Sequence, residues 1–457
     1  ERRINFQRGA SMVLEQIKEF IKKFSEQTQG KTIHLVSHFD TDGITSATIF
    51  AKTLERLNKR FSIKILKQLD VEDISEMPED KILVLLDLGS GSLNHLSNLK
   101  NQIFIIDHHE ISKTLETIPK NVTIINPHLL KNYEELCTAE LTYLVSKEIS
   151  ESNKELAYLS VIGMIGDVME KNISKIRNMI IEDSKVTIKK GLLLYPSTRP
   201  LDKTIEYSSS PFIPGATGNH LGSIDLLNEA GIKRLTNNYK PLIDLNEKEM
   251  KNLTTAVLLR LSSKQKASDY IGNLYLVRFF NKIEDAREIS AVINACSRMD
   301  YPQVAFMMCM GNFSARKKAE GIYVKYRQHI ISGLKYIDKN IKIQGREYVI
   351  INAKDNVKDT IIGTLASILS FSAIYEEGTI IVAMAYNKDK IKVSTRISGK
   401  SQTSSRNLKE LLDSITQSLG GESGGHKNAA GCIIHKEQED KFIDLIKKKL
   451  EFELVKI

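Results

Sequence analysis

The chain has 457 residues, 41% of them hydrophobic and 26% charged, which is typical of a globular protein with two or three domains. A formal net charge of +9 suits a partner that carries phosphate, although many enzymes with other substrates are equally basic. Four widely spaced cysteines without a Cys-x-x-Cys pair argue against zinc knuckles and a disulfide framework, so we expect a cytoplasmic protein. No apolar run reaches the ~18 residues of a membrane-spanning helix, and the N-terminus lacks a signal-peptide pattern.

Strands and helices alternate in the first part of the chain. Apolar residues between Met12 and Phe24 recur at helical spacing and predict an amphipathic helix that ends near Gly30. Helical patterns also cover Thr45–Lys59 and Thr138–Glu148. This alternation predicts an α/β fold with a doubly wound parallel sheet. Its expected strands are Thr32–Ser37, Ser62–Leu66, Lys81–Leu86, Ile103–Ile106 and Val122–Ile125.

The pattern becomes mostly helical from about residue 183 to 343, with turns marked by proline and glycine at 196–200 and 211–215. A charged helix over Arg316–Asn340 could connect two lobes. A second α/β pattern begins near Glu347, with strands at Tyr348–Asn352, Thr379–Ala385 and Ile391–Arg396 and helices at Lys358–Phe371, Leu408–Leu419 and Lys441–Leu450. We therefore expect a first domain over residues 1–240, a mostly helical connector over 241–343 and a smaller α/β domain over 344–457.

Acidic and histidine residues follow several of the expected strands. Asp40-Thr41-Asp42-Gly43 follows the first strand, Asp87 the third and Asp107-His108-His109 the fourth, while Gly166-Asp167 lies in a later apolar segment. Ligands of open α/β sheets bind beyond the carboxyl ends of the strands, so these side chains are expected to gather there. Carboxylates and imidazoles are the ligands that a two-metal hydrolytic site needs.

Each cluster taken alone also has an ordinary structural explanation. Asp42 or Thr41 could lie near a helix N-cap, the two histidines could be a structural or solvated pair, and Asp87 could pair with a lysine. Asp167 could likewise be a helix N-cap. An unpaired carboxylate in an apolar segment is costly, however, so a cation partner is expected for Asp87 and Asp167. The occurrence of all four clusters in this order favours the metal site.

A second set of candidate residues lies near the C-terminus. The segment Gly420–Gly431 is rich in glycine and predicts a loop whose backbone N–H groups can approach phosphate oxygens. Such a loop alone is more often a plain turn, but a strand just upstream ends with a hydroxyl and a guanidinium, which can bind two phosphate oxygens at once. Together they predict a phosphate clamp made of Ser394, Arg396, Gly424, Gly425 and His426.

These motifs resemble those of the DHH-DHHA1 phosphoesterases, and most closely those of the archaeal RecJ-like exonucleases. The four N-terminal clusters match the four DHH motifs in order, and the glycine-rich segment with His426 matches the DHHA1 signature. Pro211–Asn219 and Asn294–Arg298 resemble segments of the RecJ-like branch. The resemblance extends from about residue 30 to the end and implies a DHH catalytic domain followed by a DHHA1 substrate-binding domain.

The resemblance also implies two divalent ions, with Mn²⁺ preferred and Mg²⁺ as the alternative. The implied ligands are His38, Asp40, Asp42, Asp87, His108 and Asp167. One ion would take Asp40 and Asp87, and the other would take Asp42, Asp87, His108 and Asp167, so that Asp87 bridges them. His38 is an open case, because it stands two residues before Asp40, whereas superfamily members such as the pyrophosphatases and oligoribonucleases place this histidine four residues before the motif.

The remaining roles follow from the same resemblance. His109, Asp42 and Asp87 would be the catalytic residues, with His109 contacting the scissile phosphate while a water activated by the metals attacks phosphorus. The clamp residues would hold a neighbouring phosphate across a cleft between two lobes. Asn294 and Arg298 are further candidates for contacts with the substrate backbone, although Arg298 could equally be an ordinary surface arginine.

The implied activity is metal-dependent hydrolysis of single-stranded DNA or RNA, from 5′ to 3′, releasing nucleoside monophosphates in replication or repair. Two alternatives stay open: an oligoribonuclease or linear or cyclic dinucleotide phosphodiesterase, and a replication-complex scaffold without catalysis. A GINS-like replication complex is the implied partner. Since little chain follows Gly431, we expect no counterpart of the OB-fold domain that extends bacterial RecJ.

Overall fold

The computed structural model describes residues 2–111, 117–130, 134–208, 211, 213–261, 269–372, 374–399 and 406–455. The chain divides into two compact units, one made of residues 1–189 and 274–323 and the other of 190–273 and 324–457. The domain boundaries expected at residues 240 and 343 stay a prediction. No helix of the described ranges has both the length and the apolar character needed to cross a membrane.

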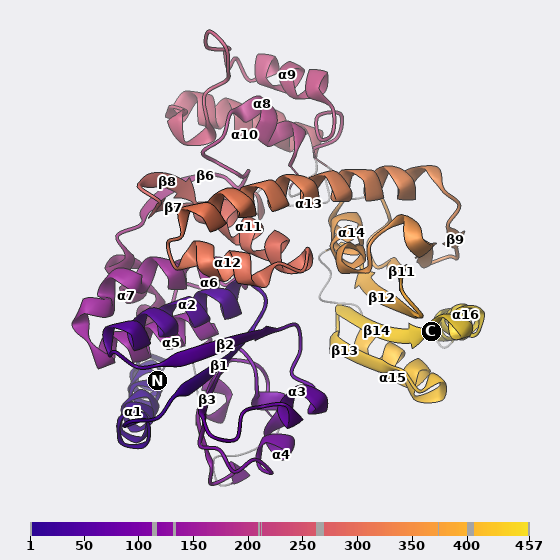
Figure 1. The fold of residues 1–457 in the computed structure, drawn as a ribbon. Coiled ribbons are helices and arrows are strands. Elements are labelled where there is room, and N and C mark those ends of the chain that lie inside the picture. The colour runs from indigo at the N-terminus through magenta and orange to yellow at the C-terminus, as the bar shows by residue number, and fades with distance from the viewer. Residues whose placement is uncertain are drawn as a thin grey trace. The chain divides into compact units, whose positions relative to one another are not determined.

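A five-stranded parallel sheet with the strand order β2-β1-β3-β4-β5 forms the centre of the first unit (Figure 1). The expected doubly wound parallel sheet is therefore confirmed. The chain passes from β1 to β2 on one side and then to β3 on the other, so the sheet changes direction between β1 and β3, where ligands bind in such folds. The strands are β1 Ile33–His38, β2 Phe61–Leu66, β3 Ile82–Leu86, β4 Ile103–Ile106 and β5 Val122–Ile125.

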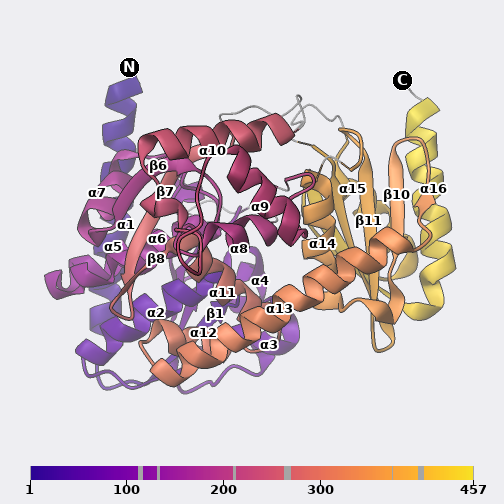
Figure 2. The same cartoon turned by 90° about the horizontal axis from the view of Figure 1, so that it is seen from above.

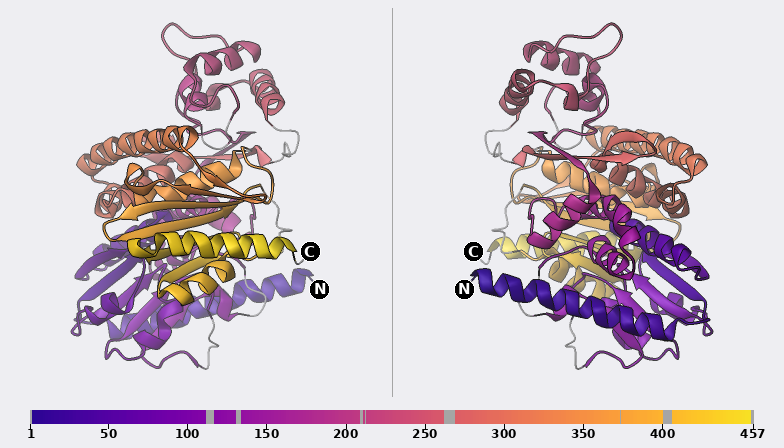
Figure 3. Two further views of the ribbon diagram at one scale, coloured as in Figure 1. Left: turned by 90° about the vertical axis from the view of Figure 1, so that its right-hand side faces the viewer. Right: turned by 90° about the vertical axis from the view of Figure 1, so that its left-hand side faces the viewer.

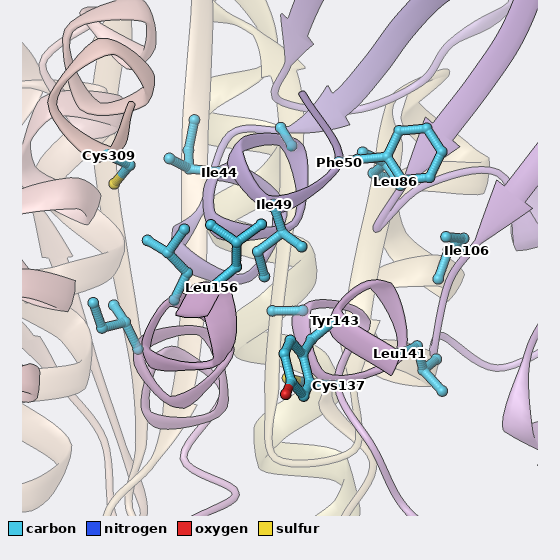
Figure 4. Packing of buried hydrophobic residues seen from close by; sticks show 14 of the residues in the cluster. Ile44, Ile49, Phe50, Leu86, Ile106, Cys137, Leu141, Tyr143, Leu156 and Cys309 are labelled. Carbon is cyan, nitrogen blue, oxygen red and sulfur yellow. The ribbon is translucent and has the colours of Figure 1, made fainter. Parts of the chain in front are cut away.

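Helices cover both faces of this sheet because successive strand residues point to opposite sides. Val84 and Leu86 belong to one apolar core, and Leu83 and Leu85 to the other. Figure 4 shows the first core, where side chains of α2 and α5 lie beside Leu86 and the strand residue Ile106. The helices on this face are α1 Arg2–Gln27, α2 Thr41–Arg56 and α5 Thr138–Ile149, and those on the other are α3 Val71–Ser75 and α4 Leu93–Leu96.

The middle of the chain is mostly helical, as expected, but it also contains a three-stranded sheet that the sequence did not predict. Its strands are β6 Thr187–Leu192, β7 Ile271–Phe279 and β8 Lys282–Asp285. The expected charged helix is present as α13, Phe313–Lys339, a single long helix (Figure 2). The other helices here are α6 Ala157–Gly166, α7 Lys175–Ser184, α8 Leu201–Glu206, α9 His220–Glu229, α10 Glu247–Arg260, α11 Ala286–Arg298 and α12 Pro302–Cys309.

The second unit contains a six-stranded mixed sheet with the order β13-β14-β12-β11-β10-β9. Two helices, α15 and α16, pack against one face and form an apolar core with it (Figure 3, yellow helices), while α14 lies against the other face. The helices are α14 Asp359–Phe371, α15 Leu408–Leu419 and α16 Glu439–Val455. The strands are β9 Ile343–Gln344, β10 Tyr348–Asn352, β11 Ile380–Asn387, β12 Lys390–Ile397, β13 Glu422–His426 and β14 Ala429–His435.

The expected glycine-rich loop is a β-hairpin, so this part of the sequence prediction is wrong. Gly424 and Gly425 lie on β13, which pairs antiparallel with β14. A Cβ on Gly425 would stand 2.5 Å from the carbonyl oxygen of Ala429, and one on Gly431 would stand 2.9 Å from that of Val393. Glycine at these two positions therefore permits a close approach of neighbouring strands rather than forming a loop.

Candidate metal centre

The first motif is shaped by the turn between β1 and α2. Asp40 is the N-cap of α2, and its Oδ1 accepts a hydrogen bond of 3.0 Å from the backbone N–H of Gly43. A Cβ on Gly43 would stand 2.2 Å from the carbonyl oxygen of His38, so only glycine fits at this position. The turn places Asp42 in the first turn of α2, where it is buried.

Asp87 follows β3 and adopts a positive φ of 61°, which aspartate tolerates better than most residues. Its side chain is 1% exposed. One oxygen, Oδ2, lies 3.1 Å from His38 Nδ1, and the other, Oδ1, lies 3.5 Å from His108 Nε2. The two carboxylate oxygens of Asp87 therefore lie next to two different histidines, His38 and His108.

Asp167 reaches the same place from the end of α6. Two glycines let this helix approach its neighbours: a Cβ on Gly166 would stand 2.6 Å from Cβ of Thr41, and one on Gly163 would stand 2.9 Å from Oδ1 of Asp42. Asp167 is the C-cap of α6, so the alternative that it caps a helix N-terminus is wrong. Its Oδ2 lies 3.1 Å from His108 Nε2.

The pair of histidines after β4 is oriented by Asp107, whose role the sequence did not reveal. Asp107 is 1% exposed, and its Oδ1 accepts a hydrogen bond of 2.7 Å from Nδ1 of His109. Its Oδ2 accepts a further bond of 3.0 Å from the backbone N–H of Ser90. These bonds leave Nε2 of the half-exposed His109 as the nitrogen available to a ligand. The available signal was an aspartate directly before two histidines at the end of a buried strand.

The structure thus brings all six expected ligands together. Ligand atoms within 4.8 Å of one another form three sets among the described residues, and Asp87 belongs to two of them. The sequence left it open whether His38 is a ligand. In the structure, its Nδ1 lies 3.1 Å from Asp40 Oδ2. The three sets are His38, Asp40 and Asp87; Asp42, His108 and Asp167; and Asp87, His108 and His109. Mixed sets of carboxylate and imidazole donors fit Mn²⁺ and related divalent ions.

The electrostatics of the acidic residues also fit a cation. Burial, and then repulsion by Asp167 and Asp87, raises the pKa of Asp42 well above its ordinary value. Burial and the nearby charge of Asp40 raise the pKa of Asp87 to about 6. Carboxylates that repel one another in a buried place are stabilised by a positive charge among them.

The histidines partly supply that charge in the metal-free protein. Burial alone lowers the pKa of His38, but attraction by Asp40 and then a hydrogen bond with Asp87 outweigh it and raise the pKa to about 11. Burial likewise opposes protonation of His108, yet a hydrogen bond with Asp167 and attraction by other carboxylates raise its pKa to about 10. In the metal-free protein, these protonated imidazoles therefore supply part of the positive charge that a divalent ion would bring.

The expected phosphate-clamp residues share one face of the second unit's sheet. Residues paired across neighbouring strands lie on the same face, and the register aligns Ser394, Gly431 and Gly424 in one row. Arg396, Ala429 and His426 form the next row on the same face. Ser394 is buried, and a Cβ added to Gly363 of α14 would stand 3.1 Å from its Oγ. His426 and both glycines of β13 are exposed.

The two weaker candidates lie on α11, which contacts the turn after β1. Thr41 Oγ1 donates a hydrogen bond of 3.1 Å to the carbonyl oxygen of Ser290, and Ser297 Oγ donates to that of Phe39. Asn294 lies between these two serines on the same side of the helix, and both Asn294 and Arg298 are partly exposed. The helix that carries them therefore packs directly against the first motif.

Comparison with known families gives three matches along the chain. Residues 32–164 match the N-terminal domain of the DHH family, 194–275 the DHH-CID domain and 346–451 the DHHA1 domain. The domain content of the DHH-DHHA1 phosphoesterases, which the sequence motifs led us to expect, is therefore present in this chain. The uncharacterized protein MJ0831 of Methanocaldococcus jannaschii is 25% identical over 449 residues, which cover 94% of this chain and 97% of that protein.

Solved structures share the fold at low identity. RecJ of Thermus thermophilus in complex with Mn²⁺ is 17% identical with a TM-score of 0.60, and the match covers 95% of this chain but 54% of that one. This chain thus spans about half the length of that RecJ. CDC45 of Entamoeba histolytica is 12% identical with a TM-score of 0.65, and the match covers 96% of this chain and 98% of CDC45.

Proposed function

We propose that this protein is a metal-dependent exonuclease that hydrolyses phosphodiester bonds in single-stranded DNA or RNA. The observation that carries the proposal is the convergence of carboxylates and histidines on Asp87, at the carboxyl ends of β1, β3 and β4. A purely structural cluster would bury several carboxylates that repel one another and that the two imidazoles neutralise only in part, which is unfavourable. The matches to the DHH-family N-terminal domain and to the DHHA1 domain support the reaction class.

Two sets of residues would hold the metal ions, namely His38, Asp40 and Asp87 for one and Asp42, Asp87, His108 and Asp167 for the other. When bound, such ions supply activation of a water and neutralise charge on the phosphate. Mn²⁺ is the expected ion because the shell mixes oxygen and nitrogen donors, and Thermus RecJ has been solved with either Mn²⁺ or Mg²⁺. His109, oriented by Asp107, would donate from Nε2 to an oxygen of the scissile phosphate.

The clamp residues would bind a second phosphate of the same strand. Arg396 offers a planar fork of donors, and two exposed glycines on β13 leave room for the backbone of a polynucleotide. Asn294 and Arg298 would add contacts beside the first motif. Recognition through phosphates in this way is independent of base sequence and favours a general exonuclease.

The experiment is degradation of end-labelled single strands of DNA and RNA of increasing length, with Mn²⁺ or with EDTA. The proposal predicts mononucleotides from long strands with Mn²⁺ and none with EDTA, and the label position gives the direction, expected to be 5′ to 3′. Cleavage restricted to the shortest oligonucleotides would favour the oligoribonuclease or dinucleotide phosphodiesterase instead.

A scaffold role in a replication complex is the second candidate, favoured by the likeness to CDC45 over nearly the whole of both chains. An exonuclease needs the acidic residues of the candidate metal centre for hydrolysis, whereas a scaffold does not. A GINS-like complex remains the proposed partner for either function. Absence of hydrolysis with every substrate and metal, together with stable capture of such a complex, would favour the scaffold.

A further inference from the structure

Helix α5 begins beside the candidate metal centre, and its first residue contacts two of the carboxylates. The backbone N–H of Thr138 donates a hydrogen bond of 2.7 Å to Oδ2 of Asp42, and that of Ala139 donates one of 2.8 Å to Oδ1. The hydroxyl of Thr138 donates a bond of 3.0 Å to Oδ1 of Asp87. Thr138 is thus bonded to Asp42 through its backbone and to Asp87 through its side chain.

These hydrogen bonds determine the orientation of the carboxylates of Asp42 and Asp87. Asp42 has both oxygens held by successive N–H groups, so its plane is fixed relative to α5. The bond from Thr138 holds Oδ1 of Asp87, which leaves Oδ2 directed at His38, 3.1 Å away. Thr138 is fully buried, and hydrogen bonds to ionised groups are strong where water does not compete.

The start of α5 is itself firmly supported. Oε2 of Glu140 accepts a hydrogen bond of 2.9 Å from the backbone N–H of Cys137, and Oε1 accepts one of 2.7 Å from Nε of Arg177. Arg177 also donates from a terminal nitrogen to the carbonyl oxygen of Glu135 at 2.7 Å. Both charged side chains are buried, so α5 offers a rigid support to the residues in front of it.

We propose that Thr138 is a positioning residue whose hydroxyl orients Asp87 so that each carboxylate oxygen faces a different ligand set. This inference rests on the proposed function, because it concerns the same site. An ordinary cap on α5 would account for the bonds to Asp42 but not for the side-chain bond to Asp87. The bond to Asp87 does not cap a helix. Its effect is to fix the orientation of the carboxylate that belongs to two of the ligand sets.

The test compares variants that differ in the hydroxyl alone. Thr138→Val removes it at nearly constant volume, and Thr138→Ser retains it. Thr53→Val is the matched control, since Thr53 is also fully buried but its hydroxyl bonds to the carbonyl oxygen of Ile49 at 2.8 Å, within α2. Thr138→Ala is a second variant without the hydroxyl, should the valine protein not fold.

Mn²⁺ affinity is measured on the metal-free proteins by calorimetry and by electron paramagnetic resonance, apart from any activity. Loss of a residue that orients a metal ligand weakens metal binding by roughly 10- to 100-fold. We expect that loss in Thr138→Val, affinity close to wild type in Thr138→Ser, and no change in Thr53→Val. Hydrolysis should fall in parallel in the valine variant alone.

Three results would overturn the inference: wild-type affinity in Thr138→Val, equal weakening in Thr53→Val, or failure of Thr138→Ser to restore binding. A wild-type protein that binds Mn²⁺ and hydrolyses single strands keeps the proposed function whatever Thr138 does. A wild-type protein that binds no Mn²⁺ contradicts the proposed function, and the role of Thr138 is then overturned with it.

Discussion

Asp87 combines three properties that are unfavourable in a residue with only a structural role. Its φ is positive, its side chain is buried, and its pKa is raised to about 6 by burial and by Asp40. Strained and destabilised residues of this kind are commonly found at functional sites, where the surrounding structure holds them in place. A divalent cation bound between the two ligand sets would relieve the electrostatic part of this strain.

Replacement of Asp87 by asparagine is the first prediction. Asparagine tolerates the positive φ, so the backbone is preserved. Because a ligand shared by two ions is lost, activity should fall by more than the roughly 10- to 100-fold typical of outer-sphere partners, and Mn²⁺ should no longer raise the melting temperature. Asp80→Asn, at an exposed position, is the control and should behave as wild type. Full activity of Asp87→Asn would remove the two-metal model.

The same substitution should stabilise the metal-free protein at pH 7. A carboxyl group whose pKa is raised in the folded state loses stability on ionisation above its ordinary pKa of 3.8, so removal of the charge removes that cost. Urea unfolding should therefore give a higher free energy of unfolding for Asp87→Asn than for wild type at pH 7, with the difference vanishing below about pH 4. A less stable variant at pH 7 would contradict the electrostatic argument.

Metal binding should release protons. The pKa values of His38 and His108 are raised to about 11 and about 10, so both imidazoles are protonated in the metal-free protein at neutral pH. Because Mn²⁺ binds neutral imidazole, its affinity should increase with pH until both histidines are neutral, at about pH 11. Calorimetry in buffers of different ionisation enthalpy measures the protons released. Binding that is independent of pH would mean that neither histidine is a ligand.

Among the structural elements, helix α14 determines how Arg396 of β12 is oriented for a phosphate. Its guanidinium is held by a hydrogen bond of 3.0 Å from Nε to Ser367 Oγ and one of 2.8 Å to the carbonyl oxygen of Thr395. His426 lies on the same face in the same row of the sheet. The helix α14 therefore presets the orientation of Arg396 before any substrate binds.

Arg396→Ala should raise KM and lower kcat, because a displaced phosphate misaligns the attacking group. Loss of a hydrogen bond to a charged group corresponds to an effect of about 10-fold or more on KM. Mn²⁺ affinity should be unchanged. Arg346→Ala, which removes an exposed arginine of the same unit, is the matched control. Loss of bound metal in Arg396→Ala would show that the clamp assignment is wrong.

The contact between α5 and α7 offers a prediction of stability. Asp183 accepts hydrogen bonds from Tyr143 at 2.8 Å and Lys147 at 2.5 Å and pairs with Lys154. Burial opposes its charge, but Lys147, Tyr143 and Lys154 lower its pKa below 3.8. The stabilisation is thus present above the unfolded pKa and is lost as the pH falls through the lower, folded one.

Asp183→Asn should lower the free energy of unfolding by about 2 kcal/mol at pH 7, the scale of hydrogen bonds to charged groups. The difference from wild type should shrink in acid below about pH 4, since the wild-type carboxylate is then protonated as well. Urea unfolding at both pH values is the measurement. A difference that stays constant with pH would mean that packing, and not the charge, is responsible.

Elements with a strong apolar period could be predicted from the sequence, and those defined by pairing could not. The run Lys81–Leu86 predicted a buried strand, and β3 covers Ile82–Leu86. By contrast, β6 begins with four exposed residues and carries no alternation that predicts a strand. The glycines of β13 resemble loop residues because their function, close approach to neighbouring strands, depends on the tertiary structure.

At the scale of the whole molecule, the candidate site also contains residues that the sequence predicts and residues whose roles it does not. Its acidic and histidine residues could be expected at one edge of the sheet because parallel strands end there. The roles of Asp107 and Thr138 could not be predicted in this way, since that of Asp107 depends on the orientation of the neighbouring His109 ring and that of Thr138 on a hydrogen bond with a residue far along the chain. The overall fold, shared with RecJ and CDC45 at under 20% identity, does not distinguish an enzyme from a scaffold.

The most direct test of the central claim is a crystal structure of the protein soaked in Mn²⁺, with anomalous scattering recorded at the manganese edge. The claim predicts one peak among His38, Asp40 and Asp87 and a second among Asp42, His108 and Asp167, with Asp87 contacting both. Both peaks should be lost in Asp87→Asn crystals. No anomalous peak at these residues, in crystals of a protein that still hydrolyses single strands, would contradict the claim.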